Sequence, residues 1–188
     1  MKRAMVFIDG SNFYHRLKLL LGKDAALFLS DFNYQEFCAW LCCDFVVADI
    51  RYYIGTVSRQ NNNIKSEKMY NDQQRFFRKL QAQGMAIITG QLIQHPDRSY
   101  HEKGVDVRLA VEMIRFARQN QYDQAFLISS DTDLVAAVEE VKSFGKSVQY
   151  VGIAHGQSFG LSKVCSDVRL LRPEDVKSFL PPALIMSE

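Results

Sequence analysis

The sequence has no long apolar run, no excess of one charge and no paired-cysteine motif. Hydrophobic residues make up 47% of the 188 residues, but no run reaches the length that crosses a membrane. The formal net charge of +2 is unlike that of an acidic disordered chain or a strongly basic nucleic-acid coat protein. We therefore expect a soluble globular protein with one domain at residues 1–180 and a tail at residues 181–188.

Two short signals are also missing. The apolar run that follows the basic start is broken at Asp9, so we expect no signal peptide and a cytoplasmic protein. The phosphate-cradling sequence G-x-x-x-x-G-K-S/T does not occur, which argues against an NTPase.

Cysteine and histidine give no clear metal motif. The four cysteines lack the C-x-x-C spacing of a zinc site, and three of them lie in an apolar, helix-like stretch, so we expect reduced core thiols. These cysteines are Cys38, Cys42, Cys43 and Cys165. His95 and His101 fall in a predicted long loop, residues 90–104, where we favour ordinary loop histidines over metal ligands.

Apolar segments of β-type residues alternate with segments of helical periodicity along the chain. The predicted strands are residues 4–9, 51–57, 85–89, 124–129, 147–153 and 168–171. The predicted helices are residues 12–21, 34–45, 66–83, 103–117, 131–144, 157–164 and 173–179. This alternation predicts an α/β three-layer sandwich, with a mostly parallel sheet covered on both faces.

Aspartates follow two of the predicted buried strands. Asp9 ends the first strand, and Asp131 and Asp133 come directly after the strand at 124–129. Ligands of an open parallel sheet bind in the crevice at the carboxyl ends of its strands. The alternative is that these aspartates only cap the helices that follow and match their dipoles.

A third acidic position lies in the first turn of the helix at 103–117. A helical projection places Asp106 at the edge of an apolar arc, so its carboxylate points toward the sheet end, whereas Glu112 faces solvent. The apolar arc comprises Val107, Ala110, Ile114 and Ala117. For Asp106, too, a favourable interaction with the helix dipole is the alternative.

The topology predicts that these carboxylates meet at one edge of the sheet. They are Asp9, Asp106, Asp131 and Asp133. A cluster of carboxylates without counter-charge repels itself unless hard cations neutralise it, and oxygen-only ligands select Mg²⁺ or Mn²⁺. Such ions can activate a water and clamp the attacking and leaving oxygens of a phosphodiester.

The stretch from 51 to 83 is locally basic, with seven basic residues and two acidic ones. It also contains several aromatic residues, a mixture that could bind phosphates and stack on bases. The alternative is a solvated helix face whose aromatic residues belong to the core.

Three motifs in this order resemble the NYN domain, the LabA-like or DUF88 group of the PIN-like nucleases. They are FIDGSNFY at 7–14, KGVDVRLAVEMI at 103–114 and LISSDTDL at 127–134. The resemblance covers about residues 1–153 and implies a PIN-like, Rossmann-like topology, a divalent-metal site and cleavage of RNA.

The resemblance also implies roles for single residues. Asn12 would hold Asp9 or a phosphate, and Lys103 would approach the substrate backbone. The family's last motif commonly reads S-G-D-S-D, so Ser130 and Thr132 replace a glycine and a serine at the substrate crevice. A side chain at Ser130 could narrow that crevice, and Glu112 stands where an aspartate is common.

We therefore predict a metal-dependent endoribonuclease that cleaves single-stranded RNA. Its catalytic and metal-binding residues would be Asp9, Asp106, Asp131 and Asp133. One alternative is a non-catalytic RNA-binding or regulatory protein-interaction module that keeps the acidic pocket, and another is a phosphatase for small phosphate esters. We expect no membrane partner. The sequence does not decide the oligomeric state, and a homodimer is one alternative.

Overall fold

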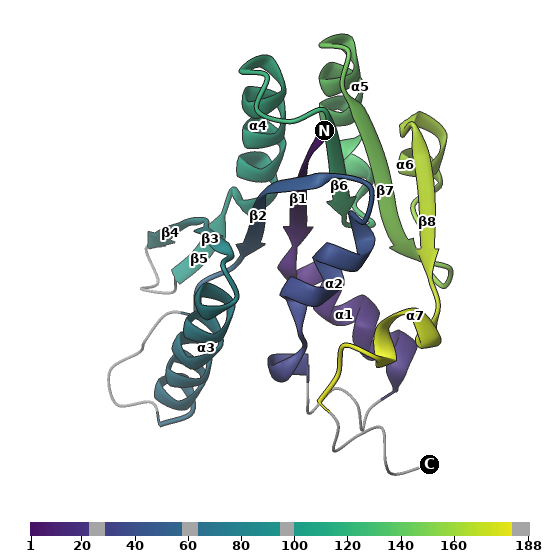
Figure 1. The fold of residues 1–188 in the computed structure, drawn as a ribbon. Helices are drawn as coiled ribbons and strands as arrows, with labels where there is room; N and C mark the ends of the chain where they lie inside the picture. The colour runs from purple at the N-terminus through teal and green to yellow at the C-terminus, as the bar shows by residue number, and fades with distance from the viewer. Residues whose placement is uncertain (23–28, 58–63, 95–99, 182–188) are drawn as a thin grey trace.

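The computed structural model describes residues 1–22, 29–57, 64–94 and 100–181, without the side chains of 91–94 and 100–103. Its centre is a six-stranded parallel sheet with the order β3-β2-β1-β6-β7-β8. The strands are β1 (Arg3–Asp9), β2 (Val46–Ile54), β3 (Ala86–Thr89), β6 (Gln124–Ile128), β7 (Ser147–Ile153) and β8 (Asp167–Leu171). All six strands end at the same edge, where α1 begins (Figure 1).

The central strands are apolar throughout because both faces of the sheet are covered. In β1, Ala4, Val6 and Ile8 pack into one core, and Met5 and Phe7 pack into the other. This alternation follows from the two-residue period of a strand. The predicted α/β three-layer sandwich is confirmed.

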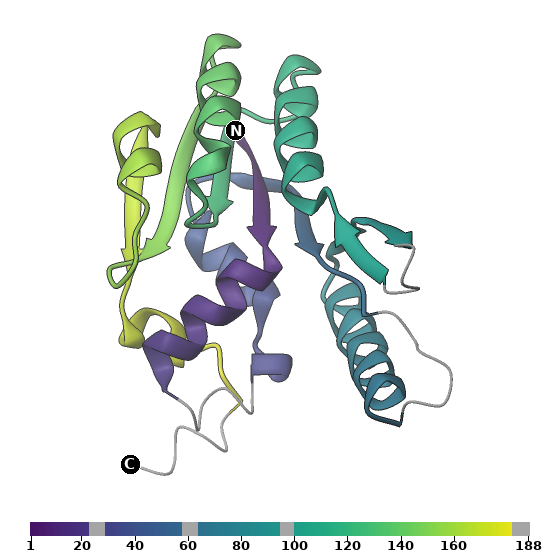
Figure 2. The ribbon, with the colours of Figure 1, turned by 180° about the vertical axis from the view of Figure 1, so that it is seen from behind.

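Helices form the two outer layers (Figures 1 and 2). The layer of α1 (Gly10–Leu21), α2 (Tyr34–Leu41), α3 (Ile64–Ala82) and α7 (Pro173–Lys177) contributes to one core. The layer of α4 (Val105–Arg118), α5 (Val135–Ser143) and α6 (Phe159–Val164) contributes to the other. A short 3-10 helix, η2 (Thr132–Leu134), precedes α5.

Several predicted boundaries were wrong. The helix predicted at 34–45 ends at Leu41, and the strand predicted at 51–57 begins at Val46 and ends at Ile54. The stretch 90–104, predicted as a loop, contains the antiparallel pair β4 (Gln91–Gln94) and β5 (Tyr100–Lys103). Its polar residues give no strand signal, so only pairing between the two segments defines them.

Some sequence predictions concern residues that the structure does not describe. His95 lies outside the described residues, as does the tail from 182, and the side chain of His101 is not described. Cys38 and Cys42 are buried free thiols and Cys165 is half-buried, whereas Cys43 is exposed, so the prediction of a core thiol was wrong for Cys43. No helix in the described ranges is both long enough and apolar enough to span a bilayer.

Candidate functional site

Asp9 links the end of β1 to the start of α1. Its carboxylate is only 7% exposed and accepts hydrogen bonds from the backbone N–H of Asn12, at 3.1 Å, and the hydroxyl of Ser129, at 2.8 Å. Burial raises the pKa of Asp9 despite these two bonds, and the charges of Asp106 and Asp131 raise it further. Asp9 is therefore a helix cap and also part of an acidic cluster.

Gly10, the first residue of α1, lets this helix pack directly against β2. A Cβ at this position would overlap the Tyr52 ring and lie 2.9 Å from the carbonyl oxygen of Tyr53. The structural requirement for glycine at this position is therefore the close approach of α1 to β2.

Asp131 and Asp133 lie where β6 gives way to η2. The Asp131 carboxylate accepts a 3.0 Å hydrogen bond from the backbone N–H of Asp133, and the Asp131 N–H donates to the Ser129 hydroxyl at 3.1 Å. Capping is thus confirmed for Asp9 and Asp131, as the alternative reading proposed. The helix predicted to start at Asp131 begins as a 3-10 turn and becomes α-helical at Val135.

Asp106 lies in the first turn of α4 and does not cap it. The N-cap is Gly104, with φ 86°, and no side chain caps this helix end. Partial desolvation and the charges of Asp131 and Asp133 raise the pKa of Asp106. The repulsion shows that carboxylates from α4 and from the end of β6 lie close enough to interact.

The cluster has no counter-charge in the part of the chain that the structure describes. None of its four carboxylates forms an ion pair there with lysine, arginine or histidine. Within the same residues, no three His, Cys, Asp or Glu side chains are grouped tightly enough to hold a metal ion. The oxygen-only, uncompensated donors suit a hard cation, but their side chains would have to turn toward it.

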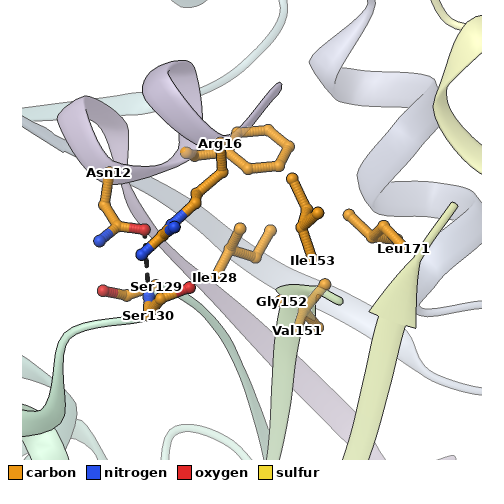
Figure 3. A pocket seen from close by; sticks show the side chains of 10 residues that line it. Asn12, Arg16, Ile128, Ser129, Ser130, Val151, Gly152, Ile153 and Leu171 are labelled. Carbon is orange, nitrogen blue, oxygen red and sulfur yellow. Dashed lines mark hydrogen bonds between the residues drawn. The ribbon is translucent and has the colours of Figure 1, made fainter. Parts of the chain in front are cut away.

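The four residues predicted to bind substrate come from different parts of the fold. The Asn12 side-chain oxygen accepts a 3.1 Å hydrogen bond from the Ser130 N–H, and the Ser130 hydroxyl lies 3.3 Å from the Tyr150 hydroxyl (Figure 3). Thr132 is exposed on η2. Lys103 is the last residue of β5, and the structure does not describe its side chain. Asn12 therefore ties α1 to the end of β6.

Glu112 was predicted to face solvent, and this was wrong. Glu112 is 6% exposed, and its carboxylate accepts a 2.8 Å hydrogen bond from the Tyr53 hydroxyl. It also forms ion pairs with Arg51, at 2.9 Å, and with Arg108, at 3.2 Å. Although burial opposes ionisation, the Tyr53 hydrogen bond and the Arg51 charge hold its pKa below the usual value.

The predicted apolar arc of α4 was wrong for Val107, which is 66% exposed. Ala117 of that arc is buried, and Ala110 and Ile114 are partly buried against the core. The fully buried residues of α4 are Leu109, Glu112, Met113 and Ala117. The projection treated the charged Glu112 as outward, whereas its partners on β2 and α4 allow it to lie inside.

Most cations of the basic segment at 51–83 are exposed on α3. They are Lys65, Lys68, Arg75, Arg78 and Lys79. Arg51 is held by ion pairs to Asp49 and Glu112 and lies 4.8 Å from the centre of the Phe116 ring, so it belongs to the fold. Arg59 lies outside the described residues. The alternative, that the aromatic residues of this segment belong to the core, is confirmed for Tyr52 and Tyr53, both of which are buried.

A groove of about 430 Å³ opens beside Asp9, between α1 and α3. Gly10 and Ser11, the two residues after Asp9, form part of its wall. Its other apolar and aromatic lining residues are Tyr14, Leu29, Tyr52, Ile54, Val57, Met69 and Phe76. The acidic cluster therefore has a hollow with apolar and aromatic lining beside it.

Sequence reasoning did not identify Arg16 as a functional candidate. It lies one turn after Asn12 on α1 and points toward Ser129 and Ser130 at the end of β6 (Figure 3). A helical spacing of four residues between Asn12 and Arg16 was the available signal.

The sequence matches the NYN domain family over residues 3–171. A protein of unknown function from Vibrio parahaemolyticus, known from a crystal structure, has the same fold with a TM-score of 0.68. The two sequences are 20% identical, and the similarity covers 96% of each chain. A search of curated proteins found no significant match. The family match spans most of the chain, and we conclude that this protein belongs to the NYN domain family, whose fold is nuclease-like.

Proposed function

We propose that the protein is a divalent-metal-dependent endoribonuclease acting on single-stranded RNA. The observation that carries this proposal is the group of four carboxylates: burial, and after it the charges of neighbouring aspartates, raise the pKa of Asp9 and of Asp106, and no cation of the described residues pairs with them. Such a group costs stability in the empty protein, and binding of Mg²⁺ or Mn²⁺ would remove that cost. The proposed ligands are Asp9, Asp106, Asp131 and Asp133.

The protein's own residues set the positions of these ligands. Ser129 and the Asn12 backbone orient the Asp9 carboxylate, and the Asp133 N–H orients that of Asp131. Asp106 and Asp133 carry no capping hydrogen bond to a backbone N–H in the described chain, so they are free to turn. A bound divalent cation would supply positive charge to the phosphodiester as negative charge develops on it.

The groove beside Asp9 supports a single-stranded nucleic acid as the substrate. Tyr14 is 39% exposed at its rim, and the half-buried Phe76 forms an aromatic part of its lining. Unpaired bases stack on such side chains, whereas a base in a duplex is not available for stacking. Asn12, Lys103, Ser130 and Thr132 are proposed to bind the substrate near the carboxylates.

A non-catalytic RNA-binding module is the second candidate. It is favoured by the lack of a tight three-residue metal group within the described ranges and by Ser130, whose side chain takes space at the crevice. Such a module would bind RNA through the same groove without cleaving it.

The test is cleavage of end-labelled single-stranded RNA in Mn²⁺, Mg²⁺ or EDTA. Wild type is compared with Asp131→Asn and with Asp44→Asn, an exposed aspartate outside the cluster. We expect metal-dependent cleavage by wild type and Asp44→Asn and a loss of at least about a hundredfold in Asp131→Asn. RNA binding without cleavage would favour the module, and turnover of a chromogenic phosphate ester without RNA binding would favour a small-ester phosphatase.

A further inference from the structure

Arg16 is a half-buried cation that the described protein leaves without a partner. In residues 1–22, 29–57, 64–94 and 100–181, its guanidinium makes no hydrogen bond, ion pair or aromatic contact. The other inward arginines have such partners, because Arg51 pairs with Asp49 and Glu112 and Arg169 lies 4.0 Å from the centre of the Trp40 ring. A half-buried arginine without a counter-charge is well suited to an external anion.

Arg16 lies where α1 meets the loop after β7. It lines a pocket of about 10 Å³, room for about one water, at the carboxyl ends of β6 and β7, together with Ser129, Ser130 and Gly152 (Figure 3). A Cβ at Gly156, whose φ is 80°, would overlap the guanidinium, so the loop after β7 packs closely on it. Because Arg16 is only half-buried, an anion too large for the pocket would meet its guanidinium from the solvent side.

A second donor lies one turn away on the same helix. The Asn12 side-chain oxygen is already occupied by the Ser130 N–H, at 3.1 Å. Its amide nitrogen therefore keeps its two N–H donors, which have no acceptor in the described part of the chain. Asn12 and Arg16 both face the pocket beside Ser130, and together they offer only donors there.

We infer that Arg16 and Asn12 form a phosphate-binding subsite for an RNA phosphodiester next to the one cleaved. This inference rests on the proposed function and identifies the side chains that hold the RNA backbone. Asn12 and Arg16 lie on one side of α1, whereas Ser11 and Tyr14 line the groove on the other side. The strand would cross the start of α1, with a base in the groove and a phosphate on Arg16, which binds phosphate in a two-bonded geometry.

The test is binding of a fluorescent single-stranded RNA between 50 and 200 mM salt in EDTA, where the metal needed for cleavage is absent. Wild type is compared with Arg16→Gln, Arg16→Lys and Lys18→Gln, the last an exposed cation on the same helix. We expect Arg16→Gln to weaken binding by about tenfold and to reduce the slope of log K against log salt by about 0.7. Arg16→Lys should keep the slope and lose only part of the affinity, and Lys18→Gln should match wild type.

Each other outcome has a defined meaning. If Arg16→Gln has the wild-type slope, or if Lys18→Gln changes it equally, the subsite is overturned while RNA binding itself stands. If wild type binds RNA neither in EDTA nor with added Mn²⁺, the proposed function fails, and this subsite fails with it. Thermal unfolding checks the fold of each variant. Should Arg16→Gln not fold, Arg16→Lys decides, because undiminished affinity would contradict two-bonded recognition.

Discussion

The Ser129 hydroxyl donates a 2.8 Å hydrogen bond to the carboxylate of Asp9, which lies 120 positions earlier in the chain. The same hydroxyl oxygen accepts a 3.1 Å hydrogen bond from the Asp131 N–H. One buried side chain therefore joins the ends of β1 and β6 and sets the spacing of two carboxylates. It is the contact through which the fold defines the acidic cluster.

Ser129→Ala should lower the free energy of unfolding by about 1–2 kcal/mol, because a buried carboxylate loses one of its two donors. The pKa of Asp9 should rise further, and Mn²⁺ binding at neutral pH should weaken. Urea unfolding and calorimetric Mn²⁺ titration measure these effects, with the exposed Ser143→Ala as control. Unchanged Mn²⁺ affinity in a destabilised Ser129→Ala would argue that Asp9 is not a ligand.

Asp9→Asn should stabilise the metal-free protein at neutral pH. The folded-state pKa of Asp9 is raised, so its ionisation disfavours the fold as pH rises through that pKa and is without effect well below the unfolded value. The melting temperature of Asp9→Asn should thus exceed that of wild type at pH 7 and approach it near pH 3. Added Mn²⁺ should raise the melting temperature of wild type but not of the variant, and equal shifts would contradict metal binding by Asp9.

Glu112→Gln should destabilise the protein by about 3 kcal/mol at neutral pH, because the inward Arg51 loses one of its two carboxylate partners. The Glu112 pKa is lowered, so the stabilisation is present above the unfolded pKa of about 4.3 and lost as pH falls through the folded value. The difference in unfolding free energy from wild type should then shrink in acid. Glu139→Gln, on an exposed residue of α5, should be neutral throughout.

Tyr14→Ala should weaken binding of single-stranded RNA by about 1–3 kcal/mol, the contribution of stacking one base on an aromatic ring. Tyr14 lines the groove and is 39% exposed, with its ring 5.6 Å from that of His15. Leu19→Ala removes an apolar side chain that is 61% exposed on the same helix and should leave binding unchanged. Equal binding by wild type and Tyr14→Ala would show that bases do not occupy the groove.

The sequence carried enough information to locate the sheet and the acidic edge. The runs at β1 and β6 are apolar on both faces, as a strand covered on both sides requires; Asp9 ends the first, and Asp131 comes three residues after the second. Strand ends of a parallel sheet lie together, so the meeting of Asp9 and Asp131 could be predicted without coordinates.

Local pattern did not reveal the position of Glu112. A helical projection assigns a charged residue to the solvent side. Nothing in the sequence of α4 indicates that its partners, Tyr53 and Arg51, lie on a strand some sixty residues away. The hairpin of β4 and β5 was missed for a related reason, because its partners are defined by pairing and not by composition.

The sequence alone determined the α/β architecture and the family, and it indicated four aspartates as candidate site residues, because these follow from periodicity and from residues adjacent in the chain. Only the tertiary structure decided which side chains satisfy one another. It showed the Ser129 bridge to Asp9, the inward position of Glu112 and the guanidinium of Arg16, which has no partner among the residues that the structure describes. Each depends on groups brought close by the packing of distant segments, and hydrogen bonds and charges act only over such short distances.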